Sequence, residues 1–284
     1  MCNTITATDA GSIRLGRISY ANVLPIYLPL ETGRIPHRYQ FVSGPPAALN
    51  EIMSAGGLDV ASVSSIEYAR RPERYLLIPD LAIGCRGPVR SVLLLSRVPV
   101  EELGGATVLV SSQTHTSAAL LRILFREHLR LDVRYEAGEA CQGMLSGEGP
   151  EAVLAIGDEA LFLRDHPGYP HALDLGEAWR QWTGLPFIFG VWVVSREAAA
   201  RMGKHGDWLW RPLLEGKRWG QAHMDQVIAA ADTISHLGSE ALACYFQGLV
   251  YDLGQEERQG LEAFFAWLVQ QGEISRAPEL TFVA

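Results

Sequence analysis

The hydrophobic and polar positions of this chain change their spacing along its length. Short runs rich in β-branched and aliphatic residues predict buried strands. These runs span residues 13–19, 58–65, 91–96, 107–110, 152–156 and 189–195. From residue 196 onward the apolar positions recur at helical spacing, which predicts a series of helices that cover a sheet. Strands alternating with helices are typical of an α/β fold.

One polar segment separates a predicted strand from a predicted helix in the middle of the chain. Six of the seven side chains at residues 111–117 carry a hydroxyl or an amide, and this stretch includes Thr114, His115, Thr116 and Ser117. A helix N-terminus offers unpaired N–H groups and the positive end of the helix dipole, which suit a carboxylate. Alternatively, Thr114 or Thr116 only caps the helix and binds no ligand.

Polar side chains also follow two earlier strands. Ser19, Tyr20 and Asn22 follow the strand at residues 13–19, and Ser64 and Ser65 close the strand at residues 58–65. Open α/β sheets bind ligands at the carboxyl ends of their strands, so these five residues are candidates for one binding site. For Asn22 the alternative is a turn residue whose side chain bonds its own backbone.

The strands predicted at residues 91–96 and 189–195 are both apolar runs that end at a Ser-Arg pair. The segment between them contains strands and helices of its own. We therefore predict a discontinuous first lobe, residues 1–96 and 195–284, and an inserted second lobe, residues 97–194. Two crossings between lobes form a hinge, and the ligand cleft is expected between the lobes.

Asp158 is the one acidic residue that we consider for the site in the inserted lobe. It follows the predicted strand at residues 152–156, at the start of a helix. There it can bind a ligand hydroxyl or act as a base, or it can serve as the helix N-cap. The spacing leaves these alternatives open.

Composition excludes several classes of partner. The chain has 284 residues, 48% of them hydrophobic, and a net charge of −8 without a block of Lys or Arg, so neither nucleic acid nor a membrane surface is an expected partner. The four cysteines stand singly, the N-terminal residues do not resemble a secretory signal, and no apolar run reaches about 18 residues. We expect a cytoplasmic protein, a monomer or a homodimer.

Several motifs of cofactor chemistry are missing from the sequence. It contains no H-E-x-x-H, no Walker loop, no G-x-G-x-x-G and no G-x-S-x-G. We therefore expect no cofactor and no metal. A cleft lined by Ser, Thr, Asn and backbone N–H groups suits a small carboxylated molecule, which the protein either holds or transforms.

Seven motifs together resemble the chorismate dehydratases of the futalosine route to menaquinone. They are R-I-S-Y-x-N-x-x-P at 17–25, L-D-V-x-x-V-S-x-x-E-Y at 58–68, G-x-x-G-P-V-x-S-V-x-L-x-S at 84–96, T-x-T-S at 114–117, I-G-D-x-A-L at 156–161, W-T-G-L-P at 182–186 and G-L-x-x-F at 260–264. They occur in order over most of the chain. The combination is far more specific than any one motif.

The resemblance implies a fold and a reaction. The fold is that of type II periplasmic binding proteins, with two α/β lobes of mixed sheets flanked by helices around a ligand cleft. The reaction is the elimination of water from chorismate to give 3-[(1-carboxyvinyl)oxy]benzoate, which is redox-neutral and needs neither nicotinamide nor a metal. Chorismate carries two carboxylates, and the turns at 114–117 and 64–65 can each receive one.

The resemblance also implies catalytic roles for Asn22 and Ser91, by motif position. Asn22 is expected to donate a hydrogen bond to an enolate-like intermediate, and Ser91 to hold the leaving hydroxyl or an ordered water. The proton acceptor is either Asp158 or the substrate's own enolpyruvyl carboxylate. We favour the substrate carboxylate, because a buried aspartate beside a dianion is driven toward its protonated form.

Three other functions remain as alternatives. A solute-binding protein shares the fold and needs no catalyst, but the N-terminal residues do not resemble a secretory signal. The related 1,4-dihydroxy-6-naphthoate synthase of the same pathway differs from residues 17–22 in its opening motif. A ligand-sensing module would need a partner domain.

Overall fold

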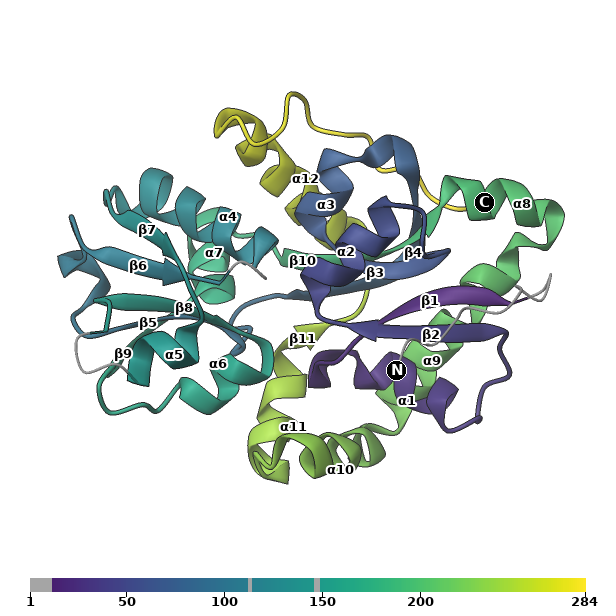
Figure 1. Cartoon of the computed structure of the whole chain (residues 1–284), viewed down its shortest axis with the longest axis horizontal. Helices are drawn as coiled ribbons and strands as arrows, with labels where there is room; N and C mark the ends of the chain where they lie inside the picture. The colour runs from purple at the N-terminus through teal and green to yellow at the C-terminus, as the bar shows by residue number, and fades with distance from the viewer. Residues whose placement is uncertain (1–11, 112–113, 146–148) are drawn as a thin grey trace, which may run out of the picture.

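The computed structural model describes residues 12–111, 114–145 and 149–284. Two β-sheets, one of six strands and one of five, lie side by side and are flanked by helices (Figure 1). We call the six-stranded sheet with its helices the first lobe and the five-stranded sheet with its helices the second lobe. The predicted two-lobed α/β class is confirmed. Within the described residues, every helix is too short or too polar to cross a lipid bilayer.

The first lobe is built on a mixed sheet. In spatial order its strands are β11 (Leu249–Val250), β4 (Tyr75–Cys85), β10 (Phe187–Ser195), β3 (Val60–Ser64), β1 (Ile13–Ile18) and β2 (Tyr39–Gly44). Strand β1 runs parallel to β2 and β3, whereas β10 runs antiparallel to β3 and β4. The carboxyl ends of β1 and β3 therefore meet at one edge, where the candidate residues follow them.

The second lobe is also mixed. Its strands are, in order, β7 (Arg134–Ala137), β6 (Thr107–Val110), β8 (Ala152–Ile156), β5 (Val92–Ser96) and β9 (His171–Asp174). Strand β6 is parallel to β7 and β8, and β5 is antiparallel to β8 and β9. Its helices are α4 (His115–Ile123), α5 (Ala140–Leu145), α6 (Gly157–Leu163) and α7 (Leu175–Thr183), and a π-helical segment, Leu124–Leu129, continues α4.

The chain crosses between the sheets earlier than the predicted lobe boundaries, residues 96/97 and 194/195. Strand β5, predicted in the first lobe, pairs with β8 and β9 in the second sheet, and β10 pairs with β3 and β4 in the first. The crossings therefore lie between Cys85 and Val92 and between Asp174 and Phe187. An apolar run indicates that a strand is buried but not which strands it pairs with, so periodicity could not place β5 or β10.

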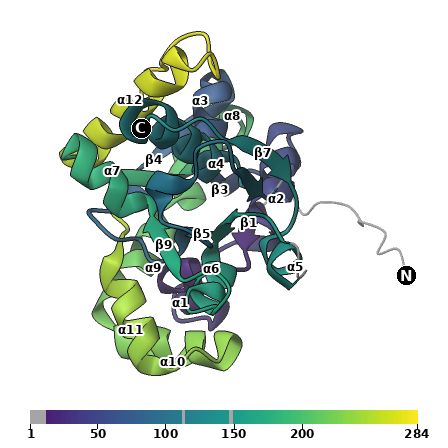
Figure 2. The ribbon, with the colours of Figure 1, turned by 90° about the vertical axis from the view of Figure 1, so that its left-hand side faces the viewer.

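Helices cover both faces of the first sheet (Figures 1 and 2). They are α1 (Leu24–Glu31), α2 (Pro46–Ser54), α3 (Ser65–Arg70), α8 (Arg196–Met202), α9 (Arg211–Ala222), α10 (Met224–Ser235), α11 (Ser239–Gly248) and α12 (Gln255–Gln270). Helices α2, α3 and α12 lie above the sheet in Figure 1, and α1, α9, α10 and α11 lie below it. The helical C-terminal part of the chain thus returns to the first lobe, as predicted.

Helix α9 approaches α1 closely. A Cβ atom at Gly220 would lie 2.1 Å from the carbonyl oxygen of Pro25, and one at Gly216 would lie 2.4 Å from that of Ile26. Only glycine permits this contact, since such distances are far below van der Waals separation. The contact fixes the start of α1, which directly follows the turn that carries Asn22.

Candidate functional site

A pocket between the lobes brings together eight of the eleven residues predicted from the sequence. They are Tyr20, Asn22, Ser64, Ser91, Thr114, His115, Thr116 and Ser117. Apolar side chains, among them Ile18, Ile83, Phe189 and Leu249, complete the lining. A larger surface hollow beside residues 273–281 contains none of the predicted residues. The pocket between the lobes is therefore the candidate site.

The structure does not place Ser19 and Ser65 in the pocket. Ser19 is exposed, whereas its neighbours Ile18 and Tyr20 line the cavity, because successive residues of an extended chain point to opposite sides. Ser65 is fully buried and donates its hydroxyl to the carbonyl oxygen of Ile188 at 2.5 Å. This bond links α3 to β10, and Ser65 is not among the residues that line the pocket.

Asp158 does not line the pocket either, but it contacts the turn beside it. Its Oδ1 accepts a hydrogen bond from the N–H of Ala21 at 3.2 Å, which joins α6 of the second lobe to the first lobe. The side chain does not cap its own helix. Burial raises the pKa of the Asp158 carboxyl, and the Ala21 N–H opposes that shift. The structure thus makes Asp158 a contact between the lobes.

Asn22 lies in a short 3₁₀ turn, Ala21–Val23, between β1 and α1. Its carbonyl oxygen accepts a hydrogen bond from the hydroxyl of Tyr251 at 2.8 Å, and the neighbouring Ala21 N–H is bound by Asp158. The side-chain Oδ1 is buried and has no hydrogen-bond partner among the described residues. Such orphaned atoms are rare in native structures. The backbone is therefore fixed while the amide remains available to the pocket.

Ser91 lies at the crossing that leads into β5 and is buried. Its carbonyl oxygen accepts a hydrogen bond from the N–H of Gly157 at 2.7 Å. Gly157 has a φ of +59°, and a Cβ there would lie 3.3 Å from the ring of Tyr20. The left-handed backbone favours glycine and lets Tyr20 close against the start of α6.

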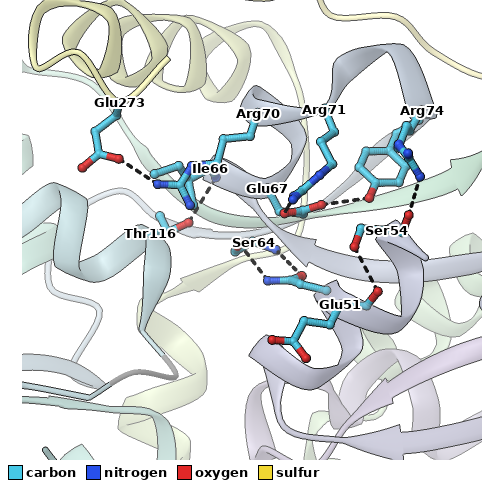
Figure 3. Close-up of polar contacts among 12 residues, drawn as sticks. Glu51, Ser54, Ser64, Ile66, Glu67, Arg70, Arg71, Arg74, Thr116 and Glu273 are labelled. Carbon is cyan, nitrogen blue, oxygen red and sulfur yellow. Dashed lines mark hydrogen bonds and ion pairs between the residues drawn. The ribbon is translucent and has the colours of Figure 1, made fainter. Parts of the chain in front are cut away.

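Helix α4 presents its N-terminus to the pocket. Thr114 precedes the helix without a side-chain cap, and its hydroxyl is buried with no hydrogen-bond partner in the described residues. The hydroxyl of Thr116 accepts a hydrogen bond from the N–H of Ile66, as Figure 3 shows. Neither threonine caps α4, so the alternative reading of this segment as a simple capped turn does not fit the geometry. Residues 112–113 of the segment lie outside the described residues.

Ser64 faces α4 from the first lobe and is held by Asn50. The amide nitrogen of Asn50 donates to the Ser64 hydroxyl at 3.1 Å, and the Asn50 oxygen accepts the N–H of Ser64 at 3.4 Å. The Ser64 hydroxyl keeps its own hydrogen to donate to a ligand. Sequence patterns gave no signal for Asn50, which is buried on α2 and touches the site only through Ser64.

The described residues that line the pocket include no Lys or Arg, and His115 is the one basic side chain among them. Among the described residues no group of metal-ligating side chains is arranged to hold an ion. The donors available to a ligand are hydroxyls, the Asn22 amide and the N-terminal N–H groups of α4. This set fits a small molecule with carboxylate groups.

Comparisons with known proteins show which family this chain resembles. Residues 13–270 match the family model described as menaquinone biosynthesis. A chorismate dehydratase of Thermus thermophilus is 32% identical over 88% of this chain and 93% of the relative. A 1,4-dihydroxy-6-naphthoate synthase of the same organism is 26% identical over 96% of this chain and 99% of its own.

Proteins of known structure have a similar fold. The periplasmic aliphatic sulphonate binding protein of Escherichia coli superposes with a TM-score of 0.66 at 15% identity, over 96% of this chain and 94% of its own. That similarity shows a periplasmic-binding-protein-like fold. The extent of the family match and the identity to the Thermus relative establish that this chain belongs to the menaquinone biosynthesis family.

Proposed function

We propose that the protein is a chorismate dehydratase, a carbon–oxygen lyase that removes water from chorismate to give 3-[(1-carboxyvinyl)oxy]benzoate. The observation that carries the proposal is the shared pocket of Asn22, Ser91 and the α4 turn. The higher identity to a chorismate dehydratase than to a naphthoate synthase supports this choice.

The pocket offers a neutral donor set to each of the two carboxylates of chorismate. One carboxylate binds at the α4 N-terminus, and the other binds near Ser64 in the first lobe. Hydrogen bonds to charged groups contribute about 1.5–3 kcal/mol each, and a helix N-terminus adds about 0.3–1 kcal/mol. A few such contacts suffice for micromolar affinity, which corresponds to roughly 8 kcal/mol.

The elimination needs a proton acceptor, a stabilised anion and a leaving hydroxyl. A proton leaves the ring carbon that bears the enolpyruvyl ether, and the hydroxyl leaves the neighbouring carbon as water, so the ring becomes aromatic. We assign Asn22 to donate a hydrogen bond to the anionic intermediate and Ser91 to hold the departing hydroxyl. The substrate's enolpyruvyl carboxylate accepts this proton and passes it to the departing hydroxyl, so that water leaves. Asp158 is less suited to this role, since it is bound to Ala21 and lies outside the lining.

The proposal is tested by incubating the purified protein with chorismate. We expect a new aromatic absorbance and a product mass lower by one water, with both signals lost in Asn22→Ala. Absence of product together with tight binding of another small carboxylate would favour a solute-binding protein.

A further inference from the structure

Tyr245 on α11 is buried beside the pocket, although no sequence motif marks it. Its helix leads directly into β11, where Leu249 lines the pocket. Two residues further, Tyr251 binds the carbonyl oxygen of Asn22 at 2.8 Å. This short segment of the chain therefore packs against the turn that carries Asn22.

Two complementary polar atoms are left without partners at this contact. The Tyr245 hydroxyl and the Asn22 Oδ1 are both buried, and neither has a hydrogen bond of good geometry within the described residues. A phenol has one hydrogen to donate, whereas an amide oxygen only accepts. Leaving both unpaired would cost about 1–3 kcal/mol for each group, so a small rotation that pairs them is favoured.

The surroundings of Tyr245 keep its hydroxyl a donor. Burial raises the pKa of the phenol, and Asp158 and Tyr20 add to the rise. The side chains of Ser91 and Asn22, which lie within hydrogen-bond reach of the hydroxyl, lower this pKa, but burial has the larger effect. The phenol thus stays protonated at neutral pH.

We propose that Tyr245 is a positioning residue for Asn22: its hydroxyl donates to Oδ1 and thereby turns the amide nitrogen Nδ2 toward the substrate. An asparagine amide has two orientations that exchange its donor and its acceptor. Only one of them presents N–H groups to a developing negative charge. This inference rests on the proposed function, because it explains how Asn22 becomes a donor at the reacting ring.

The test is Tyr245→Phe, which removes the hydroxyl and keeps the buried ring. We expect kcat for chorismate to fall about 10- to 100-fold, less than the 10²–10³-fold expected when such a donor is removed outright, while KM changes less than threefold. In the Asn22→Ala background the same substitution should change kcat less than twofold, because the group that it positions is gone. A merely structural role would lower kcat equally in both backgrounds.

Tyr169→Phe is the matched control. Its buried hydroxyl donates to the carbonyl oxygen of Pro150 at 2.8 Å in the second lobe, away from the pocket lining. It should lose about 1 kcal/mol of stability and no activity. Wild-type kcat in Tyr245→Phe, or an undiminished effect in the Asn22→Ala background, would overturn the positioning role.

A second readout separates this inference from the proposed function. The side-chain amide resonances of Asn22, identified by their loss in Asn22→Ala, should shift in Tyr245→Phe and stay in place in Tyr169→Phe. This spectrum needs no turnover. A wild-type protein inactive on chorismate would refute the dehydratase proposal alone, and unshifted Asn22 resonances would refute the positioning role alone.

Discussion

The hydroxyl of Thr116 accepts a hydrogen bond from the backbone N–H of Ile66 at 3.2 Å, and this bond joins the first turn of α4 to the first turn of α3 (Figure 3). The two helices belong to different lobes, and both residues are buried. Together with the bond from Ala21 to Asp158, it links the lobes directly beside the pocket. Two contacts between the lobes therefore lie at the edge of the candidate site.

Thr116→Val should weaken substrate binding. The substitution keeps the shape of the side chain but removes the acceptor, so the Ile66 N–H is left unsatisfied at a cost of about 1–3 kcal/mol. We expect KM for chorismate to rise about 5- to 100-fold, because 1.4 kcal/mol corresponds to a factor of ten. Steady-state kinetics of Thr116→Val measure the change, and Thr116→Ser, which retains the hydroxyl, should stay close to wild type. An unchanged KM in Thr116→Val would show that this bond does not contribute to substrate binding.

Asn22→Ala should abolish most of the dehydration. Loss of one preorganised donor to a developing anion lowers kcat by about 10²–10³. The rate of appearance of the aromatic product measures the loss. Ser19→Ala is the control from the same motif, because Ser19 is exposed and outside the pocket lining, and its activity should equal that of wild type. Comparable rates in both variants would exclude Asn22 from the chemistry.

The sequence predicts which residues share the pocket wherever that depends on strand ends. Asn22, Ser64 and the α4 turn lie in one pocket because strands of an α/β sheet place their carboxyl ends along one edge. Ser19 and Ser65 were wrongly included, because the direction of a side chain depends on the residue at which the strand ends. If a strand ends one residue earlier or later, the side chains that face the pocket and those that face away from it exchange places.

Residues that act from other parts of the chain could not be predicted. Asn50, Tyr245 and Tyr251 reach the site from helices α2 and α11 and from the end of β11, and nothing in their local sequence distinguishes them from core residues. The pairing of β5 with the second sheet could not be predicted either, because it depends on long-range contacts that periodicity does not encode.

Asp158→Asn tests the identity of the proton acceptor. If the substrate carboxylate is the base, the variant should keep kcat within about tenfold of wild type, because the amide oxygen can still accept the N–H of Ala21. Loss of 10²-fold or more, in the range of general base removal, would make Asp158 the base. The pH–rate profiles of both proteins complete the comparison.

The same variant has a second expected effect, on stability. Burial raises the pKa of Asp158 in the folded state above its unfolded value of about 3.9. The wild type therefore has its full stability below that unfolded value and loses part of it as the pH rises through the raised folded pKa. The free energy of unfolding in urea, taken as Asp158→Asn minus wild type, should be higher at pH 7 than at pH 4. A difference independent of pH would contradict the burial effect.

Asp59→Asn should show the opposite pH dependence. Asp59 precedes β3, and its carboxylate accepts hydrogen bonds from the N–H and guanidinium of Arg14 and from Arg201 at 2.8 Å. Burial alone would raise the pKa of this carboxyl, but the bonds from Arg14 and Arg201 outweigh it and lower the pKa below its usual value. The stability that Asp59 contributes is therefore present above the unfolded pKa of about 3.9 and is lost as the pH falls through the folded value.

We expect Asp59→Asn to lose about 2 kcal/mol at pH 7, the scale of a hydrogen bond to a charged group, and the loss to shrink toward pH 3. Urea unfolding at pH 7, 5 and 3 measures it. Asp165→Asn removes a carboxylate that is 91% exposed and pairs with Arg164 at 3.7 Å, and it should change stability by less than about 0.5 kcal/mol at every pH. Since Asp59 lies outside the pocket lining, kcat of Asp59→Asn should equal that of wild type below its unfolding transition. A loss of stability as large at pH 3 as at pH 7 would show that the shape of the side chain, and not its charge, holds the start of β3.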